Sequence, residues 1–228
     1  MQRGLSAVRA ALTPLGLVER GWFWPKAGDQ VPLIDGVLRP GTILLVGHLG
    51  GTLWDPFRND PDPADPVHPL DHWTRSHLSR VAAALGVGVC FPFDGPPFWP
   101  FPTWAKRADS VFDSPLGLLI HPRHGLWHAY RGALLLPHRW PAPVRRSSPS
   151  PCVRCADRPC LTACPVTAFG PGGLRLERCL WHLRAETGRE CLDQGCRARA
   201  ACPVGRESIY SLEQIRFHMR AFVESRIS

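Results

Sequence analysis

The sequence contains no long hydrophobic run, and this absence argues against a membrane-spanning protein. No apolar stretch in its 228 residues reaches the roughly 18 residues that a membrane-spanning helix needs. Residues 1–21 also lack the continuous apolar segment and the small-residue cleavage site of a secretory signal peptide. We therefore expect a cytoplasmic protein with no membrane partner. In that reducing compartment an odd number of cysteines, nine here, favours metal binding over disulfides.

Lysine is nearly absent, although the formal net charge is +8. Lys26 and Lys106 are the only lysines, so arginine carries almost all of the positive charge. Arginine pairs bidentately with phosphate, which makes RNA or a nucleotide one interpretation of the charge. The other interpretation is that the arginines offset anionic metal clusters and otherwise face solvent. We prefer the second, which leaves nucleic acid as a weakly supported partner.

The sequence also lacks a complete Walker or dinucleotide-binding fingerprint. The glycines at residues 47–51 are therefore expected to serve turns. Hydrophobic periodicity and breaker residues predict helices over 5–15, 68–85, 104–111 and from 211 onward, and strands over 42–46, 87–93, 116–120 and 126–136. We expect the last two strands to be joined by the HPRHG turn. Residues 55–69, dense in Asp and Pro, are predicted to be a loop.

This mixture of helices and strands predicts an α+β domain over residues 1–136. Residues 137–151, rich in Pro, Ser and Arg, are expected to be a linker. The remaining residues, 152–228, form a cysteine-rich domain with a C-terminal helix. Cys90 lies far from the other cysteines in sequence and is expected to be a small buried hydrophobic residue.

Eight cysteines lie in two sets, and both sets end in Cys-Pro-Val. They are arranged as Cys152-x2-Cys155-x4-Cys160-x3-Cys164 and Cys179-x11-Cys191-x4-Cys196-x5-Cys202. Two four-cysteine sets suit two [4Fe-4S] clusters of the bacterial ferredoxin type. Structural zinc sites also use C-x2-C pairs and are the main alternative. The dense first loop, the repeated half-motif and the two Cys-Pro endings favour the clusters.

In two-cluster ferredoxins the cysteine before the proline crosses to the other cluster. Applied here, this rule assigns one cluster to Cys152, Cys155, Cys160 and Cys202. It assigns the other cluster to Cys179, Cys191, Cys196 and Cys164. Both sets depart from the standard ferredoxin spacing, because the first is two residues longer and the second is stretched. Two adjacent clusters indicate transfer of single electrons.

The segment CVRCADRPCLTACPVTAFG, with the later RCLWHL and CPVG, resembles the cluster region of epoxyqueuosine reductases and reductive dehalogenases. The preceding HPR-x-G-x-W pattern, at His121, Arg123 and Trp127, is similar to a segment of CblC-type cobalamin-processing proteins. The resemblance covers roughly residues 40–205. It implies a nitroreductase-like, corrinoid-binding α+β domain followed by a two-cluster ferredoxin-like domain. It also implies that His121, Arg123 and Trp127 contribute to cofactor binding.

Asp94, in FPFDGPPFWP, falls where epoxyqueuosine reductases carry a catalytic aspartate. The resemblance thus implies a proton donor there, whereas the sequence alone is equally consistent with a residue that starts a turn. ADSVFDSPLGLL replaces the glycine-rich segment of those enzymes, and no helical repeats follow the clusters. The resemblance therefore implies a short member of the group.

Three functions remain open at this point. The first is an oxidoreductase linked to cobalamin, in which the two clusters deliver electrons to a corrinoid or another substrate. The second is a ferredoxin-type electron carrier whose N-terminal domain only docks a partner. The third is a minimal epoxyqueuosine-like reductase that modifies tRNA. Each would need a redox donor protein of the ferredoxin or flavodoxin type.

Overall fold

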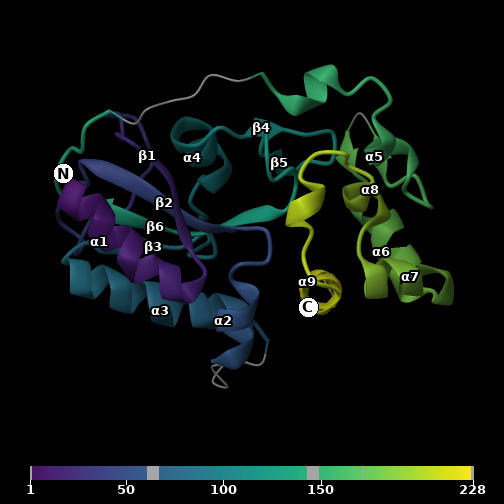
Figure 1. The fold of residues 1–228 in the computed structure, drawn as a ribbon, viewed down its shortest axis with the longest axis horizontal. Helices are drawn as coiled ribbons and strands as arrows, with labels where there is room; N and C mark the ends of the chain where they lie inside the picture. The colour runs from purple at the N-terminus through teal and green to yellow at the C-terminus, as the bar shows by residue number, and fades with distance from the viewer. Residues whose placement is uncertain (1, 61–66, 143–148, 171, 227–228) are drawn as a thin grey trace. The chain divides into compact units, whose positions relative to one another are not determined.

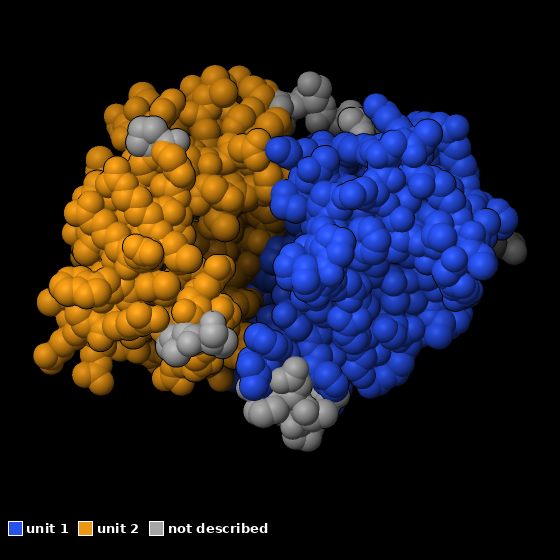
Figure 2. All heavy atoms as spheres, turned by 180° about the vertical axis from the view of Figure 1, so that it is seen from behind, with its two compact units in different colours: residues 1–110, 129–147 blue, residues 111–128, 148–228 orange. Residues whose placement is uncertain are grey.

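The computed structural model describes residues 2–60, 67–142, 149–170 and 172–226. The chain divides into two compact units, each made of two chain segments (Figure 2). The first unit comprises Met1–Ser110 and Ala129–Ser147. The second unit comprises Val111–His128 and Ser148–Ser228.

This division differs from the boundary expected at residue 136. Residues 111–128 cluster with the cysteine-rich segment and not with the N-terminal part of the chain. The start of the expected linker is anchored to the first unit, because the Trp140 amide donates to Thr42 Oγ1 at 2.8 Å and Trp24 Nε1 donates to the Trp140 carbonyl at 2.7 Å. Linker residues 143–148 lie outside the described part of the chain.

A four-stranded sheet forms the centre of the first unit, with the strand order β1-β2-β6-β3 (Figure 1). Its strands are β1 (Val18–Phe23), β2 (Thr42–Leu49), β3 (Gly88–Cys90) and β6 (His128–Leu136). β1 pairs antiparallel with β2, and β3 pairs antiparallel with β6. Successive residues of β2 are buried from Thr42 to His48, which is typical of a strand covered on both faces.

Four α-helices flank this sheet: α1 (Gln2–Leu12), α2 (Trp54–Asn59), α3 (Pro69–Leu85) and α4 (Phe101–Ala108). α1 packs against α3, whereas α4 packs on β1 and β2 (Figure 1). The predicted helix over 68–85 is confirmed as α3. It begins with a proline in its first turn and ends at Gly86, whose φ of 65° suits a glycine cap. No helix in the described ranges is long and apolar enough to cross a membrane.

The first and fourth helices begin and end earlier than predicted. α1 stops at Leu12, and a 3-10 turn, η1 (Thr13–Leu15), carries the chain to Gly16, which has a φ of 63°. α4 ends at Ala108, where Asp109 adopts an extended backbone.

The prediction of a loop from residue 55 was wrong at its start, where the chain forms α2. Asp and Pro content favoured a loop, but Trp54 and Phe57 are buried on one side of this helix. The Phe57 ring contacts the Trp73 ring of α3 at a centroid distance of 5.9 Å. Burial of aromatic surface therefore outweighed local composition. Residues 61–66 of the expected loop lie outside the described residues.

The two strands expected around the HPRHG turn do not pair with each other. β5 (Leu119–Ile120) pairs with β4 (Phe112–Asp113), whereas β6 joins the sheet of the first unit. The turn is instead closed by a single bridge between His121 and Gly125. The predicted strand over 126–136 is confirmed as β6 from residue 128, whereas residues 116–118 of the other predicted strand form a turn and only Leu119 and Ile120 are extended. β5 pairs with the nearby β4, and β6 pairs with strands distant in sequence.

Short elements make up the cysteine-rich segment of the second unit. Its helices are α5 (Pro159–Thr162), α6 (Leu176–Arg184), α7 (Arg189–Gln194), α8 (Arg197–Ala200) and α9 (Leu212–Glu224). Its remaining elements are the 3-10 turns η2 (Pro151–Arg154), η3 (Glu186–Gly188) and η4 (Arg206–Ser208) and the strand pair β7 (Phe169–Gly170) and β8 (Gly173–Leu174). α9, the predicted final helix, is capped by Ser211, whose hydroxyl accepts from the Gln214 amide at 3.2 Å.

A buried ion pair links β1 to the end of α4 in the first unit. The Arg20 side chain is almost fully buried and lies 2.7 Å from the Asp109 carboxylate. The Tyr130 hydroxyl donates to the same carboxylate oxygen at 2.9 Å. The pKa of Tyr130 is raised, mainly by burial. Removal of one partner would leave the other charge buried, which costs far more than loss of an exposed pair.

We therefore predict that Asp109→Ala lowers the free energy of unfolding by about 3–5 kcal/mol. Asp55→Ala is the matched control, because it removes an ion pair to Arg58 in which both side chains are more than half exposed. Its expected loss is within about 1 kcal/mol. Urea unfolding followed by tryptophan fluorescence measures both values. Equal losses in the two variants would contradict a stabilising role for the buried pair.

Candidate metal centre

The eight clustered cysteines line two separate hollows in the second unit. One hollow is lined by Cys152, Cys155, Cys160 and Cys202. The other is lined by Cys164, Cys179, Cys191 and Cys196. Each encloses about 330 Å³, counting space open to solvent. These two groups are the ones that the ferredoxin crossing rule predicts. Cys164 and Cys202, which each precede a proline, both line the hollow of the other sequence set.

Short helices position the thiols of the first hollow. Cys152 lies in η2, where the Ser150 hydroxyl accepts from its backbone amide at 3.3 Å. Cys160 lies in α5, which packs against α8, and Cys202 follows α8. Contact between these two helices thus brings together cysteines separated by about forty positions.

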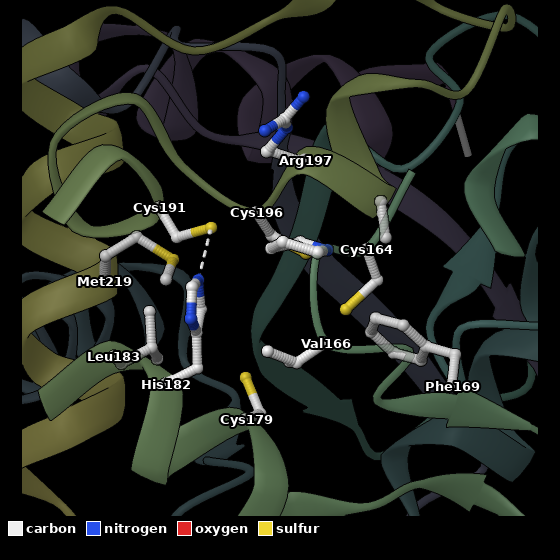
Figure 3. A pocket seen from close by; sticks show the side chains of 12 residues that line it. Cys164, Val166, Phe169, Cys179, His182, Leu183, Cys191, Cys196, Arg197 and Met219 are labelled. Atoms are coloured by element: carbon white, nitrogen blue, oxygen red, sulfur yellow. Dashed lines mark hydrogen bonds between the residues drawn. The ribbon is translucent and has the colours of Figure 1, made fainter. Parts of the chain in front are cut away.

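The second hollow draws its thiols from three helices and one loop. Cys179 lies in α6 and Cys191 in α7, whereas Cys196 caps the N-terminus of α8. Cys164 follows α5, and its Sγ accepts from the Ala168 amide at 3.3 Å. Figure 3 shows the sulfur atoms of Cys164, Cys179 and Cys191 turned toward one space.

His182 is the polar side chain that sequence reasoning missed at this hollow. Its Nε2 lies 3.7 Å from the Sγ of Cys191, and the ring is buried (Figure 3). The available signal was the Cys179-x2-His182 spacing, since residues three apart share a face of a helix. Gly188 fixes this helix end, because a Cβ there would lie 1.9 Å from the His182 carbonyl oxygen.

The pKa values of these thiols reflect the same grouping. Burial, together with the nearby thiols of Cys196, Cys164 and Cys191, raises the pKa of Cys179 to about 11. Burial is also the main cause that raises the pKa of Cys160, with contributions from Cys202, Cys152 and Cys155. Thiolates within each hollow therefore repel one another, which favours the protonated form until a cation compensates the charge.

All nine cysteines are free thiols. Cys90 is buried in β3 as expected, and burial raises its pKa. Within the described ranges, no group of three or more His, Cys, Asp or Glu side chains is arranged to hold a single metal ion.

The HPRHG segment packs closely behind the first hollow. Gly125 has a φ of 55°, and a Cβ on it would lie 2.0 Å from the Val204 carbonyl oxygen. A Cβ on Gly205 would lie 2.2 Å from the His124 carbonyl carbon. The two turns can approach this closely only because both positions are glycine. Leu116, Ile120 and Leu126 pack with Cys202 in the same buried cluster.

Residues His121, Arg123 and Trp127 lie in the second unit and have different surroundings. His121 Nδ1 accepts from the amides of Arg123 and His124 at 3.1 and 3.2 Å, so the ring closes the turn. Trp127 is buried against Tyr210 and Ile215. Arg123 is exposed. The three side chains therefore serve different local roles, and cofactor binding by them stays a prediction.

Trp127 is also covered by an arginine from the cysteine-rich segment. The Arg199 guanidinium lies 4.2 Å from the Trp127 ring centroid and donates to the Leu126 carbonyl at 2.7 Å. Arg199 is in α8, between Cys196 and Cys202. Arg199 thus connects α8 to Leu126 and Trp127, the residues that directly follow the HPRHG turn.

Asp94 lies in the first unit and has two partners. Its Oδ1 accepts from Arg75 at 2.6 Å, and its Oδ2 accepts from the Phe91 amide at 2.7 Å. The Arg75 guanidinium also lies over the Phe91 and Phe93 rings. These contacts are those of a turn-forming residue. A catalytic role for Asp94 stays a prediction.

No protein-family model and no curated protein matches the sequence. The fold is nevertheless similar to solved epoxyqueuosine reductases. The Streptococcus thermophilus enzyme matches with a TM-score of 0.54 and 17% identity, over 90% of this chain and 67% of that chain. A second epoxyqueuosine reductase, solved with an epoxyqueuosine-modified tRNA-Tyr stem loop, matches with a TM-score of 0.50 and 14% identity, over 92% and 67%.

A third similar structure is the C. elegans B12-trafficking protein CblC. It covers 98% of this chain and 97% of its own, with a TM-score of 0.48 and 12% identity. The predicted similarity to epoxyqueuosine reductases is thus confirmed at the level of the fold. At these identities the two epoxyqueuosine reductases establish a shared mixed α/β fold.

The close approach of Gly125 to Val204 leads to a prediction about the first hollow. Gly125→Ala should separate the two turns and expose Cys202, which precedes Val204 by two residues. Gly117→Ala is the matched control, since Gly117 also has a positive φ (73°) but nothing lies within 4 Å of an added Cβ. Mass-spectrometric alkylation of the metal-free protein should show Cys202 labelled about ten-fold faster only in Gly125→Ala. Equal labelling in both variants would contradict the packing argument.

Proposed function

We propose that the second unit holds two [4Fe-4S] clusters and that the protein is an oxidoreductase passing single electrons through them. The observation that carries this proposal is the division of eight cysteines between two hollows, four to each. In each hollow three thiols come from one sequence set and the fourth comes from the other. Crossed ligation of this kind is the arrangement of two-cluster ferredoxins.

The chemistry of the donor set fits a cluster better than it fits zinc. Four ligands of a structural zinc ion lie about 2.0–2.3 Å from a single point. A cubane cluster instead offers a separate iron atom to each thiolate, so its four ligands surround a larger body. Four cysteines around one hollow are consistent with the cubane. Cys179, on the more stretched set, lines its hollow with the other three.

The side chains and amides around the hollows would keep the thiolates charged and in place. The Ala168 amide donates to Cys164, and the amides of Arg199 and Ala198 lower the otherwise raised pKa of Cys196. His182 is placed to donate to Cys191. Hydrogen bonds to cluster sulfur and partial exclusion of water both tune the reduction potential. When bound, such clusters accept and release one electron at a time.

We further propose that the electron acceptor is a corrinoid. The HPR-x-G-x-W resemblance to cobalamin-processing proteins and the fold shared with epoxyqueuosine reductases support this choice. No corrinoid site is assigned to individual residues, because Trp127 is buried and His121 closes a turn. Reduction of a tRNA base and electron transfer to a docked protein partner are the competing functions that the experiments below separate.

Metal analysis of cysteine variants tests the clusters. Anaerobically purified protein should contain about eight iron and eight sulfide per chain. Cys160→Ala and Cys191→Ala, one from each hollow, should each lose about half of both, because each removes one ligand of one cluster. Cys90→Ala is the control and should keep full iron, since Cys90 lines neither hollow. Zinc without sulfide in the wild-type protein would contradict the proposal.

Titration with cob(II)alamin tests the acceptor. Under anaerobic conditions the corrinoid should co-elute with the protein in gel filtration, and its absorption spectrum should shift because the binding site replaces bulk water around it. Addition of dithionite should then yield reduced corrinoid faster with the clustered protein than with Cys191→Ala. An unchanged spectrum and a free corrinoid would remove the corrinoid from the proposal and favour an electron carrier.

A further inference from the structure

Helix α6 has two faces with different chemistry. Its inner face carries Cys179, His182 and Leu183, which line the second hollow. Its outer face carries Arg178, Trp181 and Arg184, all exposed. These three follow one another at intervals of three residues, so they form one stripe along the helix. The stripe and the hollow are therefore separated only by the width of this helix.

Trp181 is the unusual member of the stripe. It is 79% exposed, although Trp is among the largest apolar side chains and is usually buried on at least one face. Other tryptophans in the chain, such as Trp73, Trp104 and Trp127, are nearly completely buried. Trp and Arg are the residue types most enriched at the energetic centres of protein interfaces. An exposed Trp between two arginines therefore has the composition that is typical of the centre of a protein–protein interface.

The charge of the stripe indicates what it would bind. Neither Arg178 nor Arg184 forms an ion pair with a carboxylate in the described part of the chain. Exposed Arg175 precedes the helix, and exposed Arg189 begins α7. Glu177 is the one acidic residue of α6. Unpaired cations around an apolar centre are complementary to an acidic protein surface, which they would attract over about a Debye length.

We propose that this outer face of α6 docks an acidic electron-transfer protein, which donates electrons to the cluster held by Cys164, Cys179, Cys191 and Cys196. The inference rests on the proposed function and adds the entry point and the kind of partner. One electron leaves the reduced partner and enters the cluster, and no bond or proton needs to move on this chain. Cys179, which lines that hollow, lies two residues before Trp181 on the same helix.

RNA is the other anionic partner that a basic face can bind. Proteins that bind single strands present successive aromatic side chains on which bases stack, along a basic groove. The face of α6 instead has one aromatic residue on a convex helix. Its position on the helix that supplies a cluster ligand also matches electron entry. An acidic protein is therefore the partner that the observations favour.

Reduction kinetics with an acidic flavodoxin test this inference. The probe is the flavodoxin with fully reduced flavin, mixed anaerobically with the clustered protein, and flavin oxidation is followed by stopped flow. The charge-reversal variant is Arg178→Glu/Arg184→Glu, with Trp181→Ala as the variant of the apolar centre. The control is Arg58→Glu/Arg80→Glu, which makes the same change in net charge on α2 and α3 of the first unit.

For the wild-type protein the second-order rate should fall as salt is added, because the attraction is screened. At low salt, reduction of the charge-reversal variant by the flavodoxin should be at least about ten-fold slower than reduction of the wild-type protein. Reduction of Trp181→Ala should be several-fold slower. The control should keep the wild-type rate. Reduction by dithionite, a small reductant that needs no docking face, should be unchanged in all variants.

Two outcomes would overturn the inference while leaving the clusters in place. One is an unchanged flavodoxin rate in the charge-reversal variant, with iron, sulfide and dithionite reduction intact. The other is an RNA stem loop whose binding is lost in that variant while the flavodoxin rate is unchanged, which would assign the face to RNA. Absence of iron and sulfide from the wild-type protein would instead contradict the proposed function itself.

Discussion

Four thiols that line one small hollow cannot all ionise unless positive charge lies among them, and this constraint governs the second unit. Burial and, to a smaller extent, the three neighbouring thiols raise the pKa of Cys179 to about 11. In the metal-free protein the protonated form is therefore favoured at neutral pH. Iron would reverse this preference by compensating the thiolate charge, with release of protons.

The scaffold around the hollows consists of short turns that approach one another closely. Gly125 and Gly205 let the HPRHG turn contact the loop after Cys202. Arg199 lies across Trp127 and donates to Leu126, which holds α8 to the same segment. Gly188 lets the chain pass the end of α6 beside His182. Helices of four to nine residues would be unstable alone, so these tertiary contacts maintain them.

The cysteine sets could be predicted from the sequence because a short loop fixes the local spacing of the ligands. The expected crossing of Cys164 and Cys202 came from the ferredoxin pattern, and the lining of the two hollows has the same grouping. The α3 helix was predictable from its apolar stripe and its Gly86 cap. For α3, the apolar stripe and the glycine cap lie within, or directly next to, the helix that they specify.

The features that sequence reasoning missed depend on contacts between distant residues. α2 forms because Trp54 and Phe57 have a buried surface to pack on, which the local Asp and Pro content does not reveal. β6 pairs within the four-stranded sheet of the first unit and not with β5, although only residues 121–127 separate the two strands. His182 faces Cys191 because α6 and α7 pack together. Asp94 has Arg75 as a partner nineteen residues away, which no local pattern indicated.

Native mass spectrometry of the anaerobically purified protein tests the central claim most directly. The account predicts that the intact mass exceeds the mass of the polypeptide by two Fe4S4 units, and that mild oxidation removes these units one after the other. A mass increase that matches one or two zinc atoms, or a polypeptide with no added mass under the same conditions, would contradict it.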